Sequence, residues 1–205
     1  HGGSATVLTL GPEAAAEQLR EGLAMQAGAA TLLETDGEEW APRETANAIA
    51  ELVRQREADG EGFDLLLFGN ESADAGNYQV PVRVAHALGL PCVTGIKDLA
   101  VEDGTATAKR EVSGGSEGYE GELPAVISVK EGLNEPRYAS MRAKMQARRQ
   151  GVPSVEPARE SGPGTFEMVR LETPEEDESE AEILGEGPDA ASAVVDVLRD
   201  ELEVL

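Results

Sequence analysis

A polar loop at residues 69–79, GNESADAGNYQ, holds residue types that could bind an anionic ligand. It follows a continuous apolar run and precedes an amphipathic one, so we expect it at the carboxyl end of a strand, where doubly wound sheets bind ligands. Gly69 and Gly76 would let backbone N–H groups approach a phosphate, and Asn77 and Gln79 would add amide donors. The loop has neither a Walker nor a Rossmann glycine pattern. The residues therefore leave open a nucleotide site and a plain connecting loop capped by Asn77.

A charged pair, Arg110 and Glu111, lies shortly before the turn signal Gly114-Gly115. Neighbouring side chains at a strand end point to opposite faces of the sheet. A carboxylate at this position could accept hydrogen bonds from a cofactor or hold an arginine of a partner chain. The alternative is a surface pair that flanks a hairpin turn.

A docking segment is predicted at residues 134–149, where the motif NEPRY leads into a basic helix. Met141 and Met145 lie one helical turn apart, and flexible methionines surrounded by charge suit a transient contact with another protein. The alternative is a solvated helix that buries both methionines in the core. The cations of this segment that follow Tyr138 are Arg142, Lys144, Arg148 and Arg149.

Several kinds of chemistry are disfavoured by composition. The chain has two histidines and one cysteine, with no Ser-His-Asp set and no paired metal ligands. His86 lies alone on an apolar helix, and we interpret Cys92 as a small core thiol. A net charge of -23 would repel nucleic acid phosphates. Nothing in the sequence is suited to making or breaking covalent bonds.

The charge balance also indicates adaptation to high salt, with an ordinary acidic protein as the alternative. Forty acidic residues face 17 basic ones, of which only four are lysines, and aromatic residues make up 3%. In about 1 M salt the Debye length is about 3 Å, so like charges on such a surface barely repel. No apolar run approaches the about 20 residues that span a bilayer, and no secretory segment is visible. We expect a cytoplasmic protein that is not embedded in a membrane and whose natural N-terminus precedes His1.

Alternating strand and helix patterns predict an α/β fold, a doubly wound and mostly parallel sheet. Within it, the run FDLLLFG at 63–69 is predicted as the buried middle strand, with helices on both faces. The run from residue 98 to 129 contains no helix pattern, so we expect an added β-hairpin. We predict a nucleotide-binding α/β domain over 1–150 and an acidic linker or arm with a C-terminal helix over 151–205.

The run KREVSGGSEGYEGELPAVISVKEGLNEPRY, at residues 109–138, resembles the beta subunit of electron-transfer flavoproteins. That family shows R-E-x-x-G-G-x-E, then L-P-A-V, then N-E-P-R-Y. The loop GNESADAGNYQV and the segment EGLAMQAGAATLL also resemble their family counterparts. The similarity covers roughly residues 5–150. It implies a fold like the adenine-nucleotide alpha hydrolases and a heterodimer with an alpha subunit that holds most of the FAD.

The resemblance also implies roles for particular residues. Gly69, Asp74, Asn77 and Gln79 fall on the family's loop for AMP, or for a second FAD in electron-bifurcating members. Arg110 and Glu111 fall near the flavin held by the partner. Met141 falls on the apolar anchor that enters a pocket on the donor dehydrogenase. The residues predicted to dock are Asn134, Glu135, Arg137, Tyr138 and Met141.

The sequence departs from the family in the nucleotide loop, where Ala75 and Gly76 replace common acids and Pro81 replaces a usual Gly. The family's first strand has no counterpart, which leaves AMP and FAD both open. The predicted function is an electron carrier between flavin dehydrogenases, such as acyl-CoA dehydrogenases, and a quinone-linked oxidoreductase. The alternatives are a module like the universal stress proteins, which binds ATP or AMP without redox chemistry, and an accessory subunit without nucleotide.

Overall fold

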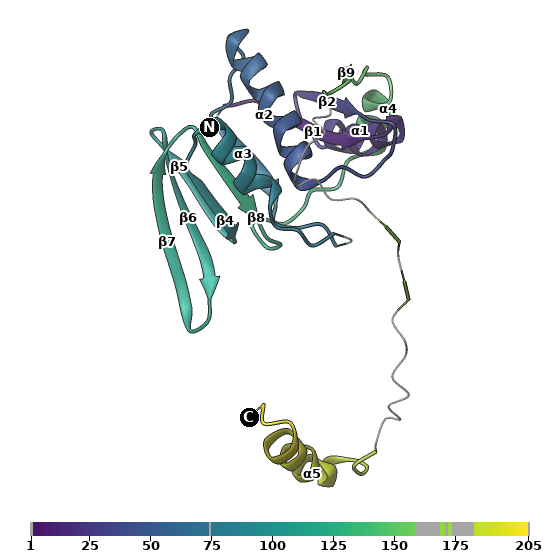
Figure 1. The fold of residues 1–205 in the computed structure, drawn as a ribbon, viewed down its shortest axis with the longest axis vertical. Coiled ribbons are helices and arrows are strands. Elements are labelled where there is room, and N and C mark those ends of the chain that lie inside the picture. The colour runs from purple at the N-terminus through teal and green to yellow at the C-terminus, as the bar shows by residue number, and fades with distance from the viewer. Residues whose placement is uncertain (1, 74, 159–168, 171, 174–182, 205) are drawn as a thin grey trace. The chain divides into compact units, whose positions relative to one another are not determined.

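The computed structural model describes all residues except 1, 74, 159–168, 171, 174–182 and 205. The chain divides into two compact units, residues 1–168 and residues 169–205, and each is described by itself (Figure 1). The strands of the first unit are β1 (Thr6–Gly11), β2 (Ala29–Glu34), β3 (Leu65–Gly69), β4 (Cys92–Ile96), β5 (Asp98–Glu102), β6 (Thr105–Val112), β7 (Gly115–Glu122), β8 (Ala125–Val129) and β9 (Ser154–Val155). Its helices are a 3-10 turn (Glu13–Ala15), α1 (Ala16–Ala24), α2 (Pro42–Ala58), α3 (Val80–Leu88) and α4 (Met141–Ala147).

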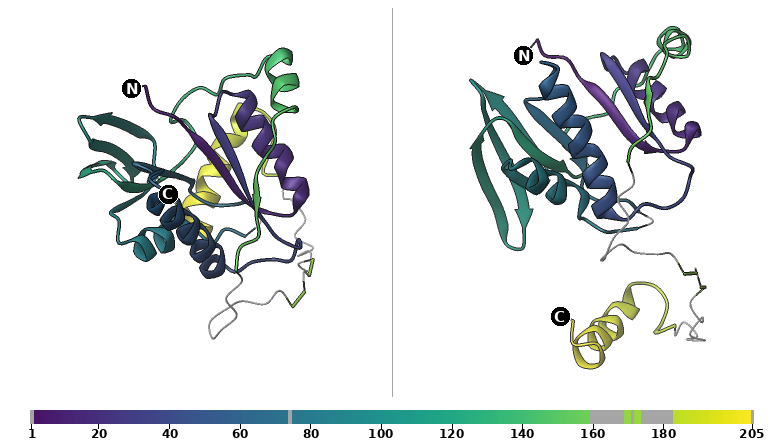
Figure 2. Two further views of the ribbon diagram at one scale, coloured as in Figure 1. Left: turned by 90° about the horizontal axis from the view of Figure 1, so that it is seen from above. Right: turned by 45° about the horizontal axis from the view of Figure 1, so that its top comes forward.

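The first parallel sheet has the order β1-β2-β9. Alternate side chains of a strand point to opposite faces of the sheet. In this sheet, different helices cover the two faces. Leu32 packs with α1 and Ala147 of α4, whereas Leu33 packs with α2. Both views in Figure 2 show α1 and α2 on opposite sides of β1 and β2.

The second parallel sheet has the order β3-β8-β4, so β8 is its central strand. In β8, Val126 is fully buried and Ile127 is 2% exposed. Leu66 and Phe68 of β3 pack against the α2 and α3 layer. β8 is therefore the strand that is buried on both faces, as expected for an apolar run in a parallel sheet.

The predicted β-hairpin addition is confirmed as an antiparallel sheet, β5-β6-β7, which lies beside β4 and β8 (Figure 1). Its inner side chains, such as Ala106 and Ala108, pack against Ile96 and Ile127. The pairing of Glu102 with Thr105 and of Val112 with Gly115 defines two tight turns. The antiparallel sheet therefore covers the face of the second parallel sheet that the helices leave free.

The prediction that residues 63–69 form the buried middle strand is wrong. β3 pairs with β8, and no described strand pairs with its other edge. Leu67 of β3 is 54% exposed, and the central position belongs to β8 instead. The described strands thus confirm the α/β fold class, with parallel and antiparallel sheets whose strand pairing falls into three groups.

The second unit contains a 3-10 turn (Pro188–Ala190), α5 (Ala191–Asp196) and a π-helical turn (Val197–Glu201). The predicted C-terminal helix is therefore present. Its apolar side chains Val194 and Leu202 are exposed, at 43% and 59%. β9 belongs to the first unit, and the predicted domain boundary near residue 150 stays a prediction. No helix among the described residues has the length and apolarity to cross a membrane.

Candidate functional site

Three parallel strands end together at the edge where the predicted nucleotide loop begins. Gly69 of β3 and Ile96 of β4 both pair with Val129 of β8. Carboxyl ends of parallel strands form the usual ligand crevice of open α/β sheets. This edge is the candidate site, and the residues around it come from four segments of the chain.

The loop at 69–79 runs from β3 to the start of α3. The backbone N–H of Gly76 donates to the Ser72 carbonyl at 2.9 Å, and Gly76 has φ +55, a left-handed conformation that favours glycine. Asn77 is exposed, and the N-cap of α3 is Gln79, so the alternative in which Asn77 caps the helix is wrong. Asp74, the remaining predicted contact, lies outside the described residues.

Gln79 does not cap α3 with its side chain. Instead, its Oε1 accepts hydrogen bonds from Arg83, at 3.0 Å from Nε and 2.8 Å from Nη2. These bonds orient the amide, because only its oxygen can accept from a guanidinium. The Gln79 amide N–H groups are then the donors it has left for a ligand.

Three residues that the sequence analysis missed hold the start of this loop. The Ser128 hydroxyl donates to Oδ1 of Asn70 at 3.1 Å and accepts from the backbone N–H of Gly95 at 2.9 Å. Ser128 is 1% exposed. The signal available in the sequence was a hydroxyl residue inside the apolar strand AVISV, where a fully buried strand normally carries only apolar side chains.

Arg110 is brought to the same edge, since its Cδ would lie 3.9 Å from a Cβ built on Gly95. Its guanidinium donates to Glu117 Oε2, 3.2 Å from Nε and 2.6 Å from Nη2, and also to the Tyr119 hydroxyl. The guanidinium carbon lies 5.0 Å from the centre of the Tyr119 ring. Arg110 therefore has partners within its own hairpin.

Glu111 points to a different partner, Lys97, which the sequence analysis also missed. Lys97 Nζ lies 2.9 Å from Glu111 Oε2 and 3.8 Å from Glu131 Oε1. Lys97 directly follows β4, and its backbone N–H donates to the Lys109 carbonyl of β6. The pair thus joins the parallel sheet to the hairpin at the candidate site.

The pKa values at this edge are shifted by these contacts. The hydrogen bond and charge of Glu111 raise the pKa of Lys97. Hydrogen bonds from Tyr119 and Arg110 lower the pKa of Glu117, and the bond to Glu117 raises the pKa of the Tyr119 phenol. Near pH 7 Lys97 is therefore cationic, Glu117 is ionised and Tyr119 is neutral.

The docking segment packs beside α1, apart from the strand edge. Arg137 Nη2 donates to the Met25 carbonyl at 3.3 Å, and Lys144 Nζ lies 3.5 Å from Glu21 Oε1. The Ser140 hydroxyl caps α4 by accepting from the Ala143 N–H at 3.2 Å. Asn134 Nδ2 donates to the Glu135 carbonyl at 3.1 Å, which tightens the start of the segment.

The side chains that this segment presents are large and exposed. Tyr138 is 100% exposed, Met141 76% and Met145 56%. The alternative in which both methionines enter the core is therefore wrong. An exposed apolar group surrounded by cations is typical of a surface for another protein.

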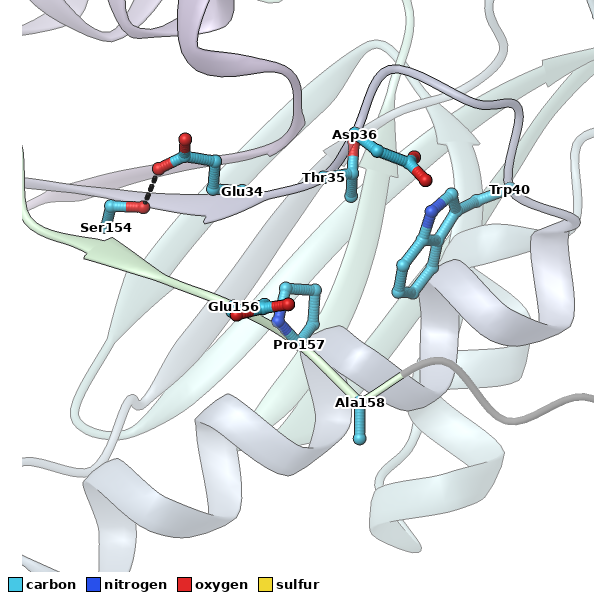
Figure 3. Close-up of a pocket in the computed structure, with 8 residues that line it drawn as sticks. All are labelled: Glu34, Thr35, Asp36, Trp40, Ser154, Glu156, Pro157 and Ala158. Carbon is cyan, nitrogen blue, oxygen red and sulfur yellow. Dashed lines mark hydrogen bonds between the residues drawn. The ribbon is translucent and has the colours of Figure 1, made fainter.

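A separate pocket of about 910 Å³ opens at the carboxyl end of β2 (Figure 3). Its lining includes three acidic residues, Glu34, Asp36 and Glu156, together with Trp40. Glu34 accepts a hydrogen bond from Ser154, which fastens β9 to β2. No sequence prediction concerned this pocket.

Comparisons of the chain with a family model and with individual proteins identify the same family. Residues 1–160 match the model of the electron transfer flavoprotein domain. The chain is 32% identical over 210 residues to the electron transfer flavoprotein subunit beta of Bacillus subtilis, covering 100% of this chain and 80% of that protein. It is 40% identical over 151 residues to the subunit of the same name from Mycobacterium tuberculosis, covering 73% of this chain and 55% of that protein.

The chain belongs to the electron transfer flavoprotein family, as a beta subunit. This confirms the resemblance seen in the sequence and places the chain among electron-carrier subunits and not among enzymes. A further relative is named caffeyl-CoA reductase-Etf complex subunit CarD, from Acetobacterium woodii, and is 35% identical over 150 residues, covering 71% of this chain and 55% of that protein. The chain spans 80% of the length of the Bacillus subtilis subunit and little more than half the length of the other two relatives.

Proposed function

We propose that the chain is one half of a heterodimer that carries electrons on FAD held mainly by an alpha subunit. Electrons enter from flavin dehydrogenases, such as acyl-CoA dehydrogenases, and leave to a quinone-linked oxidoreductase in the cytoplasm. The flavin supplies the redox chemistry, and the chain supplies positioning and electrostatics. The two parallel sheets and the helices that cover them would together correspond to the doubly wound fold of the adenine-nucleotide alpha hydrolases.

The observation that supports this proposal most strongly is that two predicted sites share one strand edge. Loop 69–79 starts there, and Lys97 brings Glu111 to the same place. Gly69, Asp74, Asn77 and Gln79 would hold AMP or a second FAD, with the phosphates near the start of α3. Arg110 and Glu111 would face the flavin of the alpha subunit.

The competing proposal is a nucleotide-binding module like the universal stress proteins. It is supported by the fact that the whole loop at 69–79 lies in this chain. It does not account for the exposed Tyr138 and Met141.

One experiment separates the two proposals. The chain would be purified together with a candidate alpha chain, the visible spectrum recorded and the released nucleotides identified. A yellow heterodimer that releases AMP supports the electron carrier, and two FAD per dimer indicates bifurcation. A colourless monomer that releases ATP would contradict the electron-carrier proposal and support the stress-protein module.

The docking role of Met141 gives a second prediction. Met141→Ala should slow electron uptake from the dehydrogenase about tenfold or more, because a buried apolar anchor typically contributes at least that much to an interface. Flavin content should stay unchanged. The measurement is stopped-flow reduction of the heterodimer, with Val155→Ala on β9, 38% exposed, as the control. Equal rates for both variants and the wild type would refute the anchor.

A further inference from the structure

The central strand β8 contains one buried hydroxyl among apolar neighbours. Ser128 is 1% exposed, and Val126 and Ile127 before it are equally buried. A valine at this position would bury more apolar surface and leave no polar atom to satisfy. The serine therefore needs an explanation in terms of what its hydroxyl does.

The Ser128 hydroxyl is both a hydrogen-bond donor and an acceptor. It donates to Asn70 Oδ1 at 3.1 Å and accepts from the Gly95 N–H at 2.9 Å. A hydroxyl can donate one hydrogen bond and accept two, so one atom connects two segments. We name Ser128, Asn70 and Gly95 the loop latch.

Gly95 is suited to the latch in two ways. It lies at an irregularity in the pairing of β4 with β8, between Val93 and Ile96, and its φ is +67. A Cβ at Gly95 would lie 3.3 Å from Asn70 Oδ1. A bulge of this kind turns the Gly95 N–H toward Ser128, and the missing side chain lets Asn70 approach.

The loop latch lies next to the Lys97–Glu111 ion pair and so connects loop 69–79 to that pair. Gly95 is two residues before Lys97, which pairs with Glu111 at 2.9 Å. Asn70 is the first residue after β3 and therefore sets where loop 69–79 departs. With Oδ1 occupied by Ser128, the Asn70 amide presents its N–H groups as its remaining donors.

We propose that Ser128 is a positioning residue for the bound nucleotide, acting through Asn70 to fix loop 69–79 against the β4 bulge. This inference rests on the proposed function. Asn70 then adds an amide donor to the nucleotide site beside Asn77 and Gln79.

The test measures AMP binding to the heterodimer by calorimetry after the resident nucleotide is removed. Ser128→Ala and Asn70→Ala should each weaken AMP binding about tenfold, the effect of losing one buried hydrogen-bonded partner. The double variant should be no weaker than Asn70→Ala alone, because Ser128 acts through Asn70. Ser128→Thr, which keeps the hydroxyl, should restore most of the affinity.

The control is Thr31→Ala, which removes a hydroxyl that is equally buried, at 2% exposure, from β2 of the other parallel sheet. It should lower the thermal midpoint without changing AMP affinity. If Ser128→Ala and Asn70→Ala behave like this control, the latch is only structural and the proposal is overturned. Additive losses in the double variant would overturn it as well.

Hydrogen exchange of the loop amides provides a readout that does not require nucleotide. Faster exchange across residues 70–79 in Ser128→Ala and Asn70→Ala, but not in Thr31→Ala, supports the latch even if one variant is less stable. Unchanged exchange refutes it. A wild-type heterodimer that binds neither AMP nor FAD would instead refute the proposed function, and the exchange result would still decide whether the latch exists.

Discussion

At the scale of single residues, two glycines have similar backbone conformations and different surroundings: Gly95 in the candidate site, and Gly89 at the C-cap of α3. Gly95 and Gly89 have φ +67 and +69, which L side chains adopt at a cost of about 1–2 kcal/mol. A Cβ on Gly89 would meet nothing within 4 Å, whereas one on Gly95 would meet Asn70 Oδ1 at 3.3 Å. The two positions therefore form a matched pair.

Gly95→Ala should lower the free energy of unfolding by more than Gly89→Ala, and by about 1 kcal/mol or more beyond it, because it adds a close contact to the same backbone cost. Urea denaturation in molar KCl measures both. Gly95→Ala should also lose AMP affinity in the heterodimer. Equal destabilisation by the two variants would show that the space beside Asn70 is not restrictive.

At the scale of elements, the sequence predicted the hairpin, the C-terminal helix and the exposed basic segment. Turn residues and charge report directly on local structure, which is why those elements were predictable. The apolar run FDLLLFG predicted β3 as the centre of the sheet. Strand order, however, is set by long-range pairing, which an apolar run cannot specify. β8, with its single serine, takes the central place.

The same limit applies to the candidate site. Gly69, Asn77 and Gln79 were found because they lie together in one loop. Asn70, Ser128 and Lys97 were missed because their roles arise from contacts between segments 33 to 58 residues apart, or across a strand pair. Only the folded chain brings those residues together.

The Lys97–Glu111 ion pair between β4 and β6 predicts paired changes in flavin potential. Reduction adds negative charge to the flavin, so a nearby carboxylate opposes it and a nearby ammonium favours it. Glu111→Gln should raise the midpoint potential of the heterodimer, and Lys97→Gln should lower it. Redox titration measures both, with Glu120→Gln on the exposed side of β7 as the control.

Identical potentials in the wild type and both variants would show that this pair does not face the flavin. Shifts of the same sign would indicate a general loss of structure in place of an electrostatic effect.

At the scale of the whole molecule, the net charge of -23 predicts dependence on salt. Ion pairs such as Lys109–Asp98 are exposed and contribute only about 0–1 kcal/mol each. They cannot offset the repulsion of so many acids in dilute buffer. The urea midpoint should therefore rise strongly between about 0.1 M and about 2 M KCl, where the Debye length falls severalfold.

A neutral osmolyte at equal osmolality is the control, because it strengthens burial without screening charge. An equal rise with the osmolyte would contradict charge screening as the cause. Full stability in dilute buffer would contradict salt adaptation altogether.

Electron transfer through the heterodimer can be measured directly, and it decides whether this family member is an electron carrier. The heterodimer would be mixed anaerobically with a substrate-reduced acyl-CoA dehydrogenase, and the visible absorbance of its flavin followed by stopped flow. We expect rapid bleaching, followed by recovery when a quinone-linked oxidoreductase is added. A flavin that stays oxidised with every flavin dehydrogenase tried, although dithionite reduces it, would show that the heterodimer is not an electron carrier for these enzymes.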